Sequence, residues 1–427
     1  LPELYHLLQN VEQVNRVRDA ASGKILCLTG LYAPTEEVMQ LLLTELFTQA
    51  MADDCVYALY IRHDTQALVT DTLRCQGFCP VDAAGGDESL MLVDMNSPVV
   101  FLQNVETAVK APFSNDPTVL ATIRACRRKL KMALVGMYPG KLILTVSAQM
   151  IHHRLVEKIT ELNHVPMAPT YPRTLGPYMC VPFGKLLRGN AVPNTVTKTI
   201  HTDKVFAPDL LSQWIEAFPY YAPLADQMRT VKSFDRPVIL VDDQLHTGRR
   251  IRVLDPLARA QGVEIREVLV GILSGQGRDL MEQWGRTVDC VYFVPNLRAW
   301  YVESTMYPFI GGDTVRREER PQQGLQPSVN MILPYTYPEH LKRCGAAAAY
   351  GLSRACLENT FHIMTVLEAA YRRTYARNLT LGRLGEVIVL PLCPDKGNLL
   401  YDPGQAVSAY LQNDLASLER MRNLFEG

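Results

Sequence analysis

A short segment near the middle of the chain combines residue types that bind sugars and phosphates. It reads Pro237-Val238-Ile239-Leu240-Val241-Asp242-Asp243-Gln244-Leu245-His246-Thr247-Gly248. The consecutive aliphatic residues predict a buried parallel strand, and two carboxylates stand at its carboxyl end, where open α/β sheets place their ligands. Paired carboxylates accept hydrogen bonds from vicinal hydroxyls and hold hydrated divalent cations. Thr247 can donate its hydroxyl to a phosphate oxygen, and Gly248 lets the backbone approach closely.

This string resembles the binding motif for phosphoribosyl pyrophosphate (PRPP) of the type I phosphoribosyltransferases, and the resemblance spans roughly residues 135–312. It implies that Asp242 and Asp243 are the catalytic and metal-binding residues, which bind the ribose hydroxyls directly or through Mg²⁺. It also implies a turn that holds the 5′-phosphate, formed by Gln244, Leu245, His246, Thr247, Gly248 and Arg249.

One residue of this turn departs from the family. Arg250 stands two positions after Gly248, where Thr or Ser is usual. Its cation can serve as a partner for the phosphate, but its bulk can equally block the cradle. Arg250 therefore counts as a candidate substrate-binding residue and keeps a non-catalytic relative open as an alternative.

The loop that would contact pyrophosphate has two candidates. One is Val146-Ser147-Ala148-Gln149, in which Ser147 would be the binding residue. The other is Gly184-Lys185, with Arg188 close behind. The polar segment 188–204 then predicts either a mobile loop that closes over the leaving group or a solvated hairpin.

The elements that must position these residues alternate between strands and helices. We expect strands at Leu142–Val146, Tyr178–Phe183, Glu267–Leu273 and Cys290–Val294, and helices at Met150–Leu162 and Ile251–Ala260. Trp300 and Tyr301 follow the last strand, where related enzymes stack the nucleobase, although an aromatic residue there is also a common core filler. The predicted fold class is α/β: a parallel-sheet phosphoribosyltransferase-like core, an N-terminal small α/β region and a C-terminal helical region.

Residues 24–95 form a second, smaller α/β pattern. Its expected elements are strand Ile25–Leu31, a helix opened by Thr35, strand Val56–Ile61, helix Thr65–Cys75 and strand Ser89–Val93. This order, with Ala67, Leu73, Gly77 and Phe78 around the second helix end, resembles the second half of a GNAT-type N-acetyltransferase. The turn before the first helix departs from that family, because Glu36 and Glu37 stand where phosphates need amides. Acetyl transfer and a purely structural role both remain open.

The remaining chain predicts a connector, a linker and a helical end. We expect partial GNAT-like α/β structure over 1–100, a helical connector over 101–134, the phosphoribosyltransferase-like domain over 135–315, a polar linker over 316–327 and helices over 328–427. The basic residues of 120–132 predict a solvated helix face. The apolar stripes of the C-terminal helices predict packing against the rest of the chain or against a second subunit, and Asp402-Pro403 predicts a helix start.

Composition limits the partners. Lys plus Arg total 43 and Asp plus Glu total 44, which argues against a main task of holding nucleic acid or an anionic membrane. No apolar run approaches the ~18–20 residues that span a bilayer, and the N-terminus carries no secretion-signal pattern. The ten cysteines are spread singly, as in a reducing compartment. The chain is expected to be cytoplasmic, and its start at Leu1 leaves an upstream segment open.

These observations lead to three hypotheses. The first is an Mg²⁺-dependent phosphoribosyltransferase that acts on PRPP and an unidentified acceptor, for which a nucleobase is one candidate. The second is a non-catalytic module with a degenerate PRPP site. The third is an acyltransferase that uses acetyl-coenzyme A. A homodimer is compatible with each of them.

Overall fold

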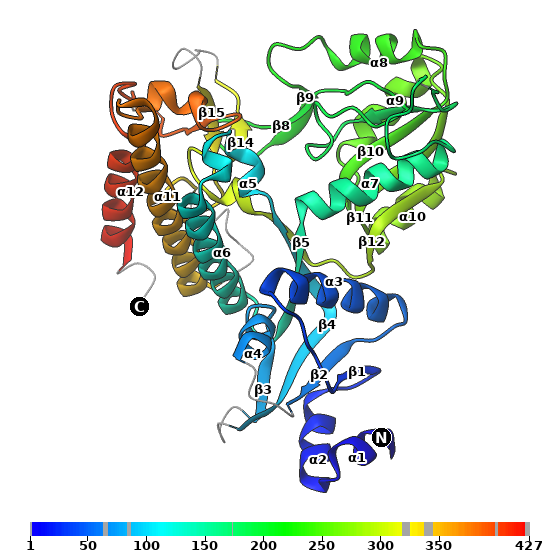
Figure 1. The fold of residues 1–427 in the computed structure, drawn as a ribbon, viewed down its shortest axis with the longest axis vertical. Helices are drawn as coiled ribbons and strands as arrows, with labels where there is room; N and C mark the ends of the chain where they lie inside the picture. Colours follow the sequence, from blue (N-terminus) through cyan, green and yellow to red (C-terminus); the bar gives the residue numbers. More distant parts are fainter. Residues whose placement is uncertain are drawn as a thin grey trace.

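The protein is mixed α/β, and its described residues form three sheets and a helical C-terminal region (Figure 1). The computed structural model describes residues 2–62, 67–82, 87–172, 174–317, 325–336, 345–397 and 400–422. No helix within these ranges has the length and apolar character needed to cross a membrane. The nine cysteines in these ranges are free thiols.

The first sheet is organised around one long strand. Its strands are β1 (Ile25–Leu28), β2 (Tyr57–Ile61), β3 (Cys79–Asp82), β4 (Asp87–Gln103), β5 (Lys141–Ser147) and β13 (Ala299–Val302). The first half of β4 pairs antiparallel with β2 and β3, whereas its second half pairs parallel with β5 and β13. The sheet therefore crosses the boundary predicted at residue 100. The helices that accompany it are α1 (Pro2–Leu8), α2 (Val11–Ala20), α3 (Glu36–Ala52) and α4 (Ala67–Arg74).

The second sheet carries the predicted motif and is entirely parallel. In spatial order its strands are β12 (Val288–Val294), β11 (Ile265–Ser274), β10 (Val238–Leu245), β6 (Met179–Pro182) and β7 (Val196–Thr197). Successive residues of β10 enter different clusters: Ile239 and Val241 pack with α7 (Ala148–Leu162), whereas Val238 and Leu240 pack with the helices on the opposite face. Those helices are α8 (Leu224–Lys232), α9 (Ile251–Ala260) and α10 (Gly275–Gln283). Burial on both faces explains the aliphatic run of β10.

The third sheet connects the second sheet to the C-terminal region. Its strands are β9 (Gln213–Ala217), β8 (Thr202–Phe206), β14 (Asp313–Val315), β15 (Gln326–Val329) and β16 (Leu392–Pro394). Strands β14 and β15 pair antiparallel with each other, and β15 begins at Gln326, within the bounds of the predicted linker 316–327. Arg317 at its start forms an ion pair with Asp395. Residues 318–324 of the predicted linker lie outside the described residues.

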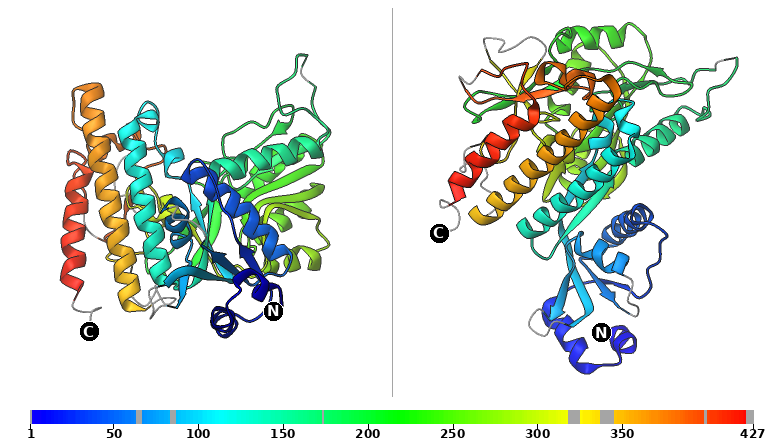
Figure 2. Two further views of the ribbon diagram at one scale, coloured as in Figure 1. Left: turned by 60° about the horizontal axis from the view of Figure 1, so that its bottom comes forward. Right: turned by 60° about the vertical axis from the view of Figure 1, so that its left-hand side comes forward.

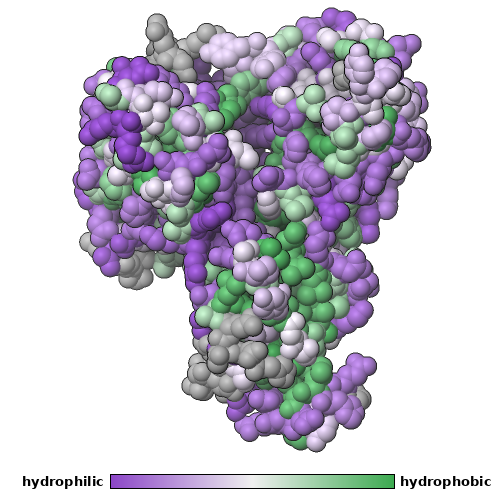
Figure 3. Space-filling view, in the orientation of Figure 1, coloured by the Kyte–Doolittle hydropathy of each residue, from purple (hydrophilic) through white to green (hydrophobic). Residues whose placement is uncertain are grey.

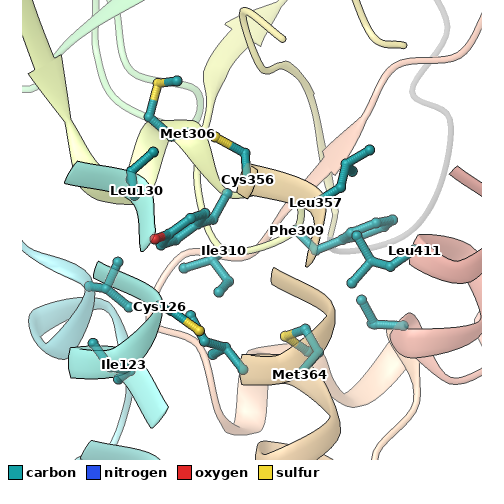
Figure 4. Packing of buried hydrophobic residues seen from close by; sticks show 14 of the residues in the cluster. Ile123, Cys126, Leu130, Met306, Phe309, Ile310, Cys356, Leu357, Met364 and Leu411 are labelled. Atoms are coloured by element: carbon teal, nitrogen blue, oxygen red, sulfur yellow. The ribbon is translucent and has the colours of Figure 1, made fainter. Parts of the chain in front are cut away.

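The C-terminal helices pack on the predicted connector rather than standing apart (Figure 2). The helices concerned are α6 (Pro117–Met137), α11 (Ala346–Tyr375) and α12 (Val407–Met421), and the short elements around them are α5 (Val105–Ala108), η1 (Phe113–Asn115), η2 (Glu303–Met306) and η4 (Leu381–Glu386). Figure 4 shows Ile123 of α6, Leu357 of α11 and Leu411 of α12 around Phe309 and Ile310. The apolar stripe of α11 is thus a packing surface within the chain.

Several sequence expectations differ from the structure. The strand expected at Leu142–Val146 is β5, which pairs with β4 in the first sheet and not with the motif strand. Trp300 and Tyr301 lie on β13 of that same first sheet. The prediction of a helix start at Asp402 is wrong, because α12 begins at Val407. The basic face of α6 is only partly solvated, since Arg127 is 12% exposed and Lys131 3%.

One apolar surface is exposed on the first-sheet part of the molecule. Figure 3 shows hydrophobic residues gathered in the lower half of this view. Val38 and Leu42 of α3 are 39% and 49% exposed. The homodimer remains a prediction.

Candidate functional site

The two motif carboxylates lie at the carboxyl end of β10 and are buried. Asp242 is 5% exposed and Asp243 9%. The strand continues through both residues to Leu245, and it lies between β11 and β6 in the parallel sheet. The strand position that the aliphatic run predicts is therefore confirmed.

Main-chain amides from the loop that follows β6 hold Asp243. The N–H groups of Lys185 and Leu186 donate to its two carboxylate oxygens at 2.7 and 2.8 Å. At Gly184, an added Cβ would lie 2.3 Å from Asp243 Oδ1 and 2.7 Å from Asp242 Oδ1. The Gly184-Lys185 segment, one of the two predicted pyrophosphate loops, therefore lies directly against the acids.

Asp242 forms an ion pair with Arg250. The guanidinium of Arg250 donates through Nη1 to Asp242 Oδ1 at 2.7 Å, and the same Nη1 is 4.0 Å from Asp243 Oδ2. The main-chain N–H of Asp243 also donates to Asp242 Oδ1, at 2.8 Å. Arg250 thus points onto the acids rather than away from the turn.

Burial and neighbouring charges shift the pKa values of Asp242 and Arg250. Burial raises the pKa of Asp242 to about 6, the Arg250 cation opposes that rise, and the neighbouring Asp243 carboxylate adds to it. Burial alone would lower the pKa of Arg250, but the charges of Asp242 and Asp243 raise it above its usual value. Asp242 is therefore a buried carboxylate, and the guanidinium of Arg250 stabilises its charged form.

The turn after β10 has the shape that the sequence requires. Gly248 has φ +72°, and an added Cβ would lie 2.2 Å from Leu280 Cδ2, so glycine is needed there. Thr247 and Arg249 are exposed on the same turn. His246 shares a hydrogen bond of 2.9 Å with the Ser274 hydroxyl, which also accepts the Gly277 N–H at the start of α10. The oxygen of the Gln244 amide is buried without a hydrogen-bond partner in the described residues.

The polar segment 188–204 is partly strand and partly turn. It contains β7 and the start of β8. Arg188 donates to the Thr202 carbonyl at 2.6 Å. The pKa of Arg188 is lowered, chiefly by burial and also by the charge of Arg250, whereas Asp203 and Asp243 oppose that shift. Its charge is therefore part of the same site.

Sequence reasoning missed the acids that the third sheet supplies. Asp203 on β8 accepts a hydrogen bond of 2.6 Å from the Thr314 hydroxyl of β14, and burial raises its pKa. Lys204 pairs with Asp313 of β14 at 2.8 Å, and the Asp313 charge acts on Arg250. The only local signal is the Asp-Lys pair at 203–204, because the partners are more than a hundred residues away.

Ser147, the other candidate for pyrophosphate binding, lies elsewhere. It ends β5 and caps α7, where its hydroxyl accepts the Met150 N–H at 3.4 Å. It lines a cavity of about 800 Å³ whose wall includes Glu36, Gln103 and Lys131 but neither motif acid. The structure therefore brings Lys185 to the acids and does not bring Ser147 there.

The donor set at the acids does not fit a directly bound Mg²⁺. Asp242 Oδ1 accepts from Arg250 and from the Asp243 amide, and both Asp243 oxygens accept main-chain N–H groups. Within the described ranges no three His, Cys, Asp or Glu side chains gather in a way that could hold a metal ion. The geometry matches a guanidinium, which donates hydrogen bonds, rather than a metal, which needs free oxygen lone pairs.

Comparison with known proteins assigns the chain to no family. No protein-family model matches the chain, and the search of curated proteins finds no relative. The fold and the site therefore rest on the residues and contacts given above.

Proposed function

We propose that the protein binds PRPP, or a related phosphorylated ribose, at the carboxyl end of β10 and transfers its phosphoribosyl group to an acceptor such as a nucleobase. The observation that supports this most directly is the convergence of three segments on Asp242 and Asp243. These segments are the strand end that carries the acids, the Gly184–Leu186 loop whose amides hold Asp243, and the turn that ends at Gly248.

The proposed roles follow from the positions of the charges. The acids would accept hydrogen bonds from the ribose hydroxyls, and the Gln244–Arg249 turn would hold the 5′-phosphate. In the transfer, the bond from C1 of the ribose to the pyrophosphate oxygen breaks, and C1 bonds to the acceptor, which releases a proton. Lys185 and Arg188, whose charges both act on Asp203, would neutralise the departing pyrophosphate.

Calorimetry tests the proposal. PRPP should bind to the wild-type protein in the presence of Mg²⁺ and should lose affinity in the Asp242→Asn/Asp243→Asn variant. No heat of binding by a folded wild-type protein would contradict the proposal.

One observation favours a second candidate, a binding module without catalysis. The Arg250–Asp242 ion pair blocks one oxygen of an acid that would have to meet the ribose. Release of pyrophosphate from PRPP with any of a panel of nucleobases would reject this candidate.

Acetyl transfer has less support from the contacts. At the start of α3, Glu36 pairs with Lys131 and Glu37 with Arg124. Carboxylates thus occupy the turn that would have to offer amides to coenzyme A. A thermal shift with acetyl-coenzyme A is the direct measurement, and its absence would remove this hypothesis.

A further inference from the structure

Arg250 occupies the place where the resemblance would put a metal. Its side chain is 21% exposed, and its guanidinium lies 2.7 Å from Asp242 and 4.0 Å from Asp243. It comes from the residue immediately before α9, so the same turn that carries Gly248 fixes its backbone. A cation is therefore built into the chain at the two acids.

We propose that Arg250 replaces Mg²⁺ at this site, so that the protein binds a phosphorylated ribose without a divalent metal. The inference rests on the proposed function for the identity of the ligand. The replacement of a metal by a guanidinium can also be tested without that ligand.

A metal ion at these acids would lie close to the Arg250 guanidinium. Two like charges a few ångströms apart in a buried site repel each other strongly. Asp242 Oδ1 already accepts two hydrogen bonds. Mg²⁺ would have to displace Arg250 and leave that guanidinium without a counter-ion.

The charges around the acids balance without a metal. The acidic side chains of the site are Asp242, Asp243, Asp203 and Asp313, and the basic ones are Arg250, Arg188, Lys185 and Lys204. A divalent cation would add charge to a site that already contains as many bases as acids. An incoming phosphate or pyrophosphate group would instead use basic groups that the site already holds.

Arg250 can also contact the ligand. Its hydrogen bond to Asp242 runs through Nη1, and a guanidinium carries five N–H donors in a fixed fork. Nε and Nη2 can therefore donate to an anionic oxygen while Nη1 stays on the acid. Thr or Ser at this position would supply neither the charge nor the fork.

The first test measures PRPP binding by calorimetry in EDTA and in Mg²⁺. The wild-type affinity should agree within about threefold between the two buffers. In Arg250→Thr, binding in EDTA should weaken by about tenfold or more, because a charge-assisted hydrogen bond is lost, and Mg²⁺ should restore it. Arg250→Gln, which keeps the length without the charge, serves as a second variant. Arg229→Thr, at an exposed side chain of α8, is the control with the same change of charge.

The second test needs no ligand. Electron paramagnetic resonance of Mn²⁺ should show no ion bound at this site in the wild type and a bound ion in Arg250→Thr or Arg250→Gln, and Asp242→Asn should abolish this gain. Mn²⁺ bound by the wild type through Asp242 would overturn the inference, and so would variants that gain no ion.

The two tests separate the possible failures. Wild-type binding of PRPP that strictly requires Mg²⁺ overturns the Arg250 inference and leaves the proposed function standing. Wild-type protein that binds no PRPP in either buffer contradicts the proposed function, and the Mn²⁺ measurement then decides the role of Arg250 by itself.

Discussion

Two glycines fix the shape of the site at the scale of single residues. Gly184 lets the backbone lie against both carboxylates, and Gly248 adopts a left-handed conformation in the following turn. Neither position tolerates a β-carbon without movement of its neighbours. The geometry around the acids therefore depends on two glycines, which have no side chain that could bind a ligand.

We predict that Gly184→Ala lowers PRPP affinity by about tenfold, since overpacking a tight site costs ~1–3 kcal/mol. Its methyl group would lie within 2.3 Å of Asp243 Oδ1. Gly136→Ala is the control, because an added Cβ at Gly136 has nothing within 4 Å and Gly136, like Gly184, has no positive φ. Calorimetry of both variants is the measurement, and equal affinity of Gly184→Ala and wild type would contradict the geometry.

Asp242 gives a prediction about pH. Its pKa rises from 3.8 in the unfolded chain to about 6 in the folded protein, mainly through burial. Between these values the folded protein binds a proton that the unfolded chain has lost. The Asp242 contribution to stability therefore falls as the pH rises through this window and levels off above about pH 6.

The measurement is urea unfolding of wild type and Asp242→Asn. Relative to Asp242→Asn, the wild type should lose about 1 kcal/mol of unfolding free energy between pH 5 and pH 7. Asp226→Asn, which removes an exposed carboxylate of α8, is the control for the loss of one negative charge at the surface. A constant difference between wild type and Asp242→Asn would contradict the raised pKa.

At the scale of elements, one buried arginine joins three of them. Arg127 of α6 donates to Glu303, which follows β13, at 2.8 and 2.9 Å, and to Glu106 of α5. Glu303 is fully buried and also accepts the N–H groups of Asn104 and Val105 after β4. The carboxyl ends of two parallel strands are thus tied to the connector helix.

We expect Arg127→Met to cost about 3–5 kcal/mol of unfolding free energy, because it leaves the Glu303 charge buried and unpaired. Arg124→Met on the same helix should cost about 1 kcal/mol or less, since Arg124 is 63% exposed and pairs with Glu37 at 3.5 Å. Urea denaturation compares the two variants. Similar losses of unfolding free energy in both variants would show that the ion pairs of Arg127 stabilise the fold no more than an exposed ion pair does.

At the scale of the whole molecule, the predicted regions share their sheets and cores. The first half of strand β4 pairs with β2 of the first predicted region, and its second half pairs with β5 and β13. The third sheet joins β8 of the motif region to β16 of the C-terminal region. One large hydrophobic cluster joins α6, α11 and α12 to the segment after β13. Truncating the chain at a boundary between predicted regions would therefore divide a sheet or a hydrophobic cluster that both regions share.

A chain that ends at residue 336 lacks α11 and α12, and we predict that it aggregates. It would expose the buried face of α6, which includes Ile123, Cys126 and Leu130. A chain that starts at residue 22 loses α1 and α2 and uncovers a smaller apolar face, which includes Leu59, Ile61 and Leu90 of the first sheet, so it should aggregate less than the 1–336 chain. Size-exclusion chromatography distinguishes the two, and a monodisperse 1–336 chain would contradict the shared core.

The local parts of the site could be predicted from the sequence because local chemistry determines them. Aliphatic residues in sequence make a buried strand, helix α9 begins and ends where its periodicity does, and Gly248 needs a positive φ. The cap at Thr35, whose hydroxyl accepts the Val38 N–H, is confirmed for the same reason. These features depend on neighbours within a few residues.

Contacts between distant segments needed the tertiary structure. Strand β5 pairs with β4 and not with the motif sheet, which removes Ser147 from the site, and β14 brings Asp313 and Thr314 to it. Arg250 could be identified as unusual from the sequence, but its contact with Asp242 depends on the docking of α9 against β10. The sequence by itself determined where the acids and the turn stand. Only the packing of elements decided which charges meet them, because an ion pair depends on distance in space and not on distance along the chain.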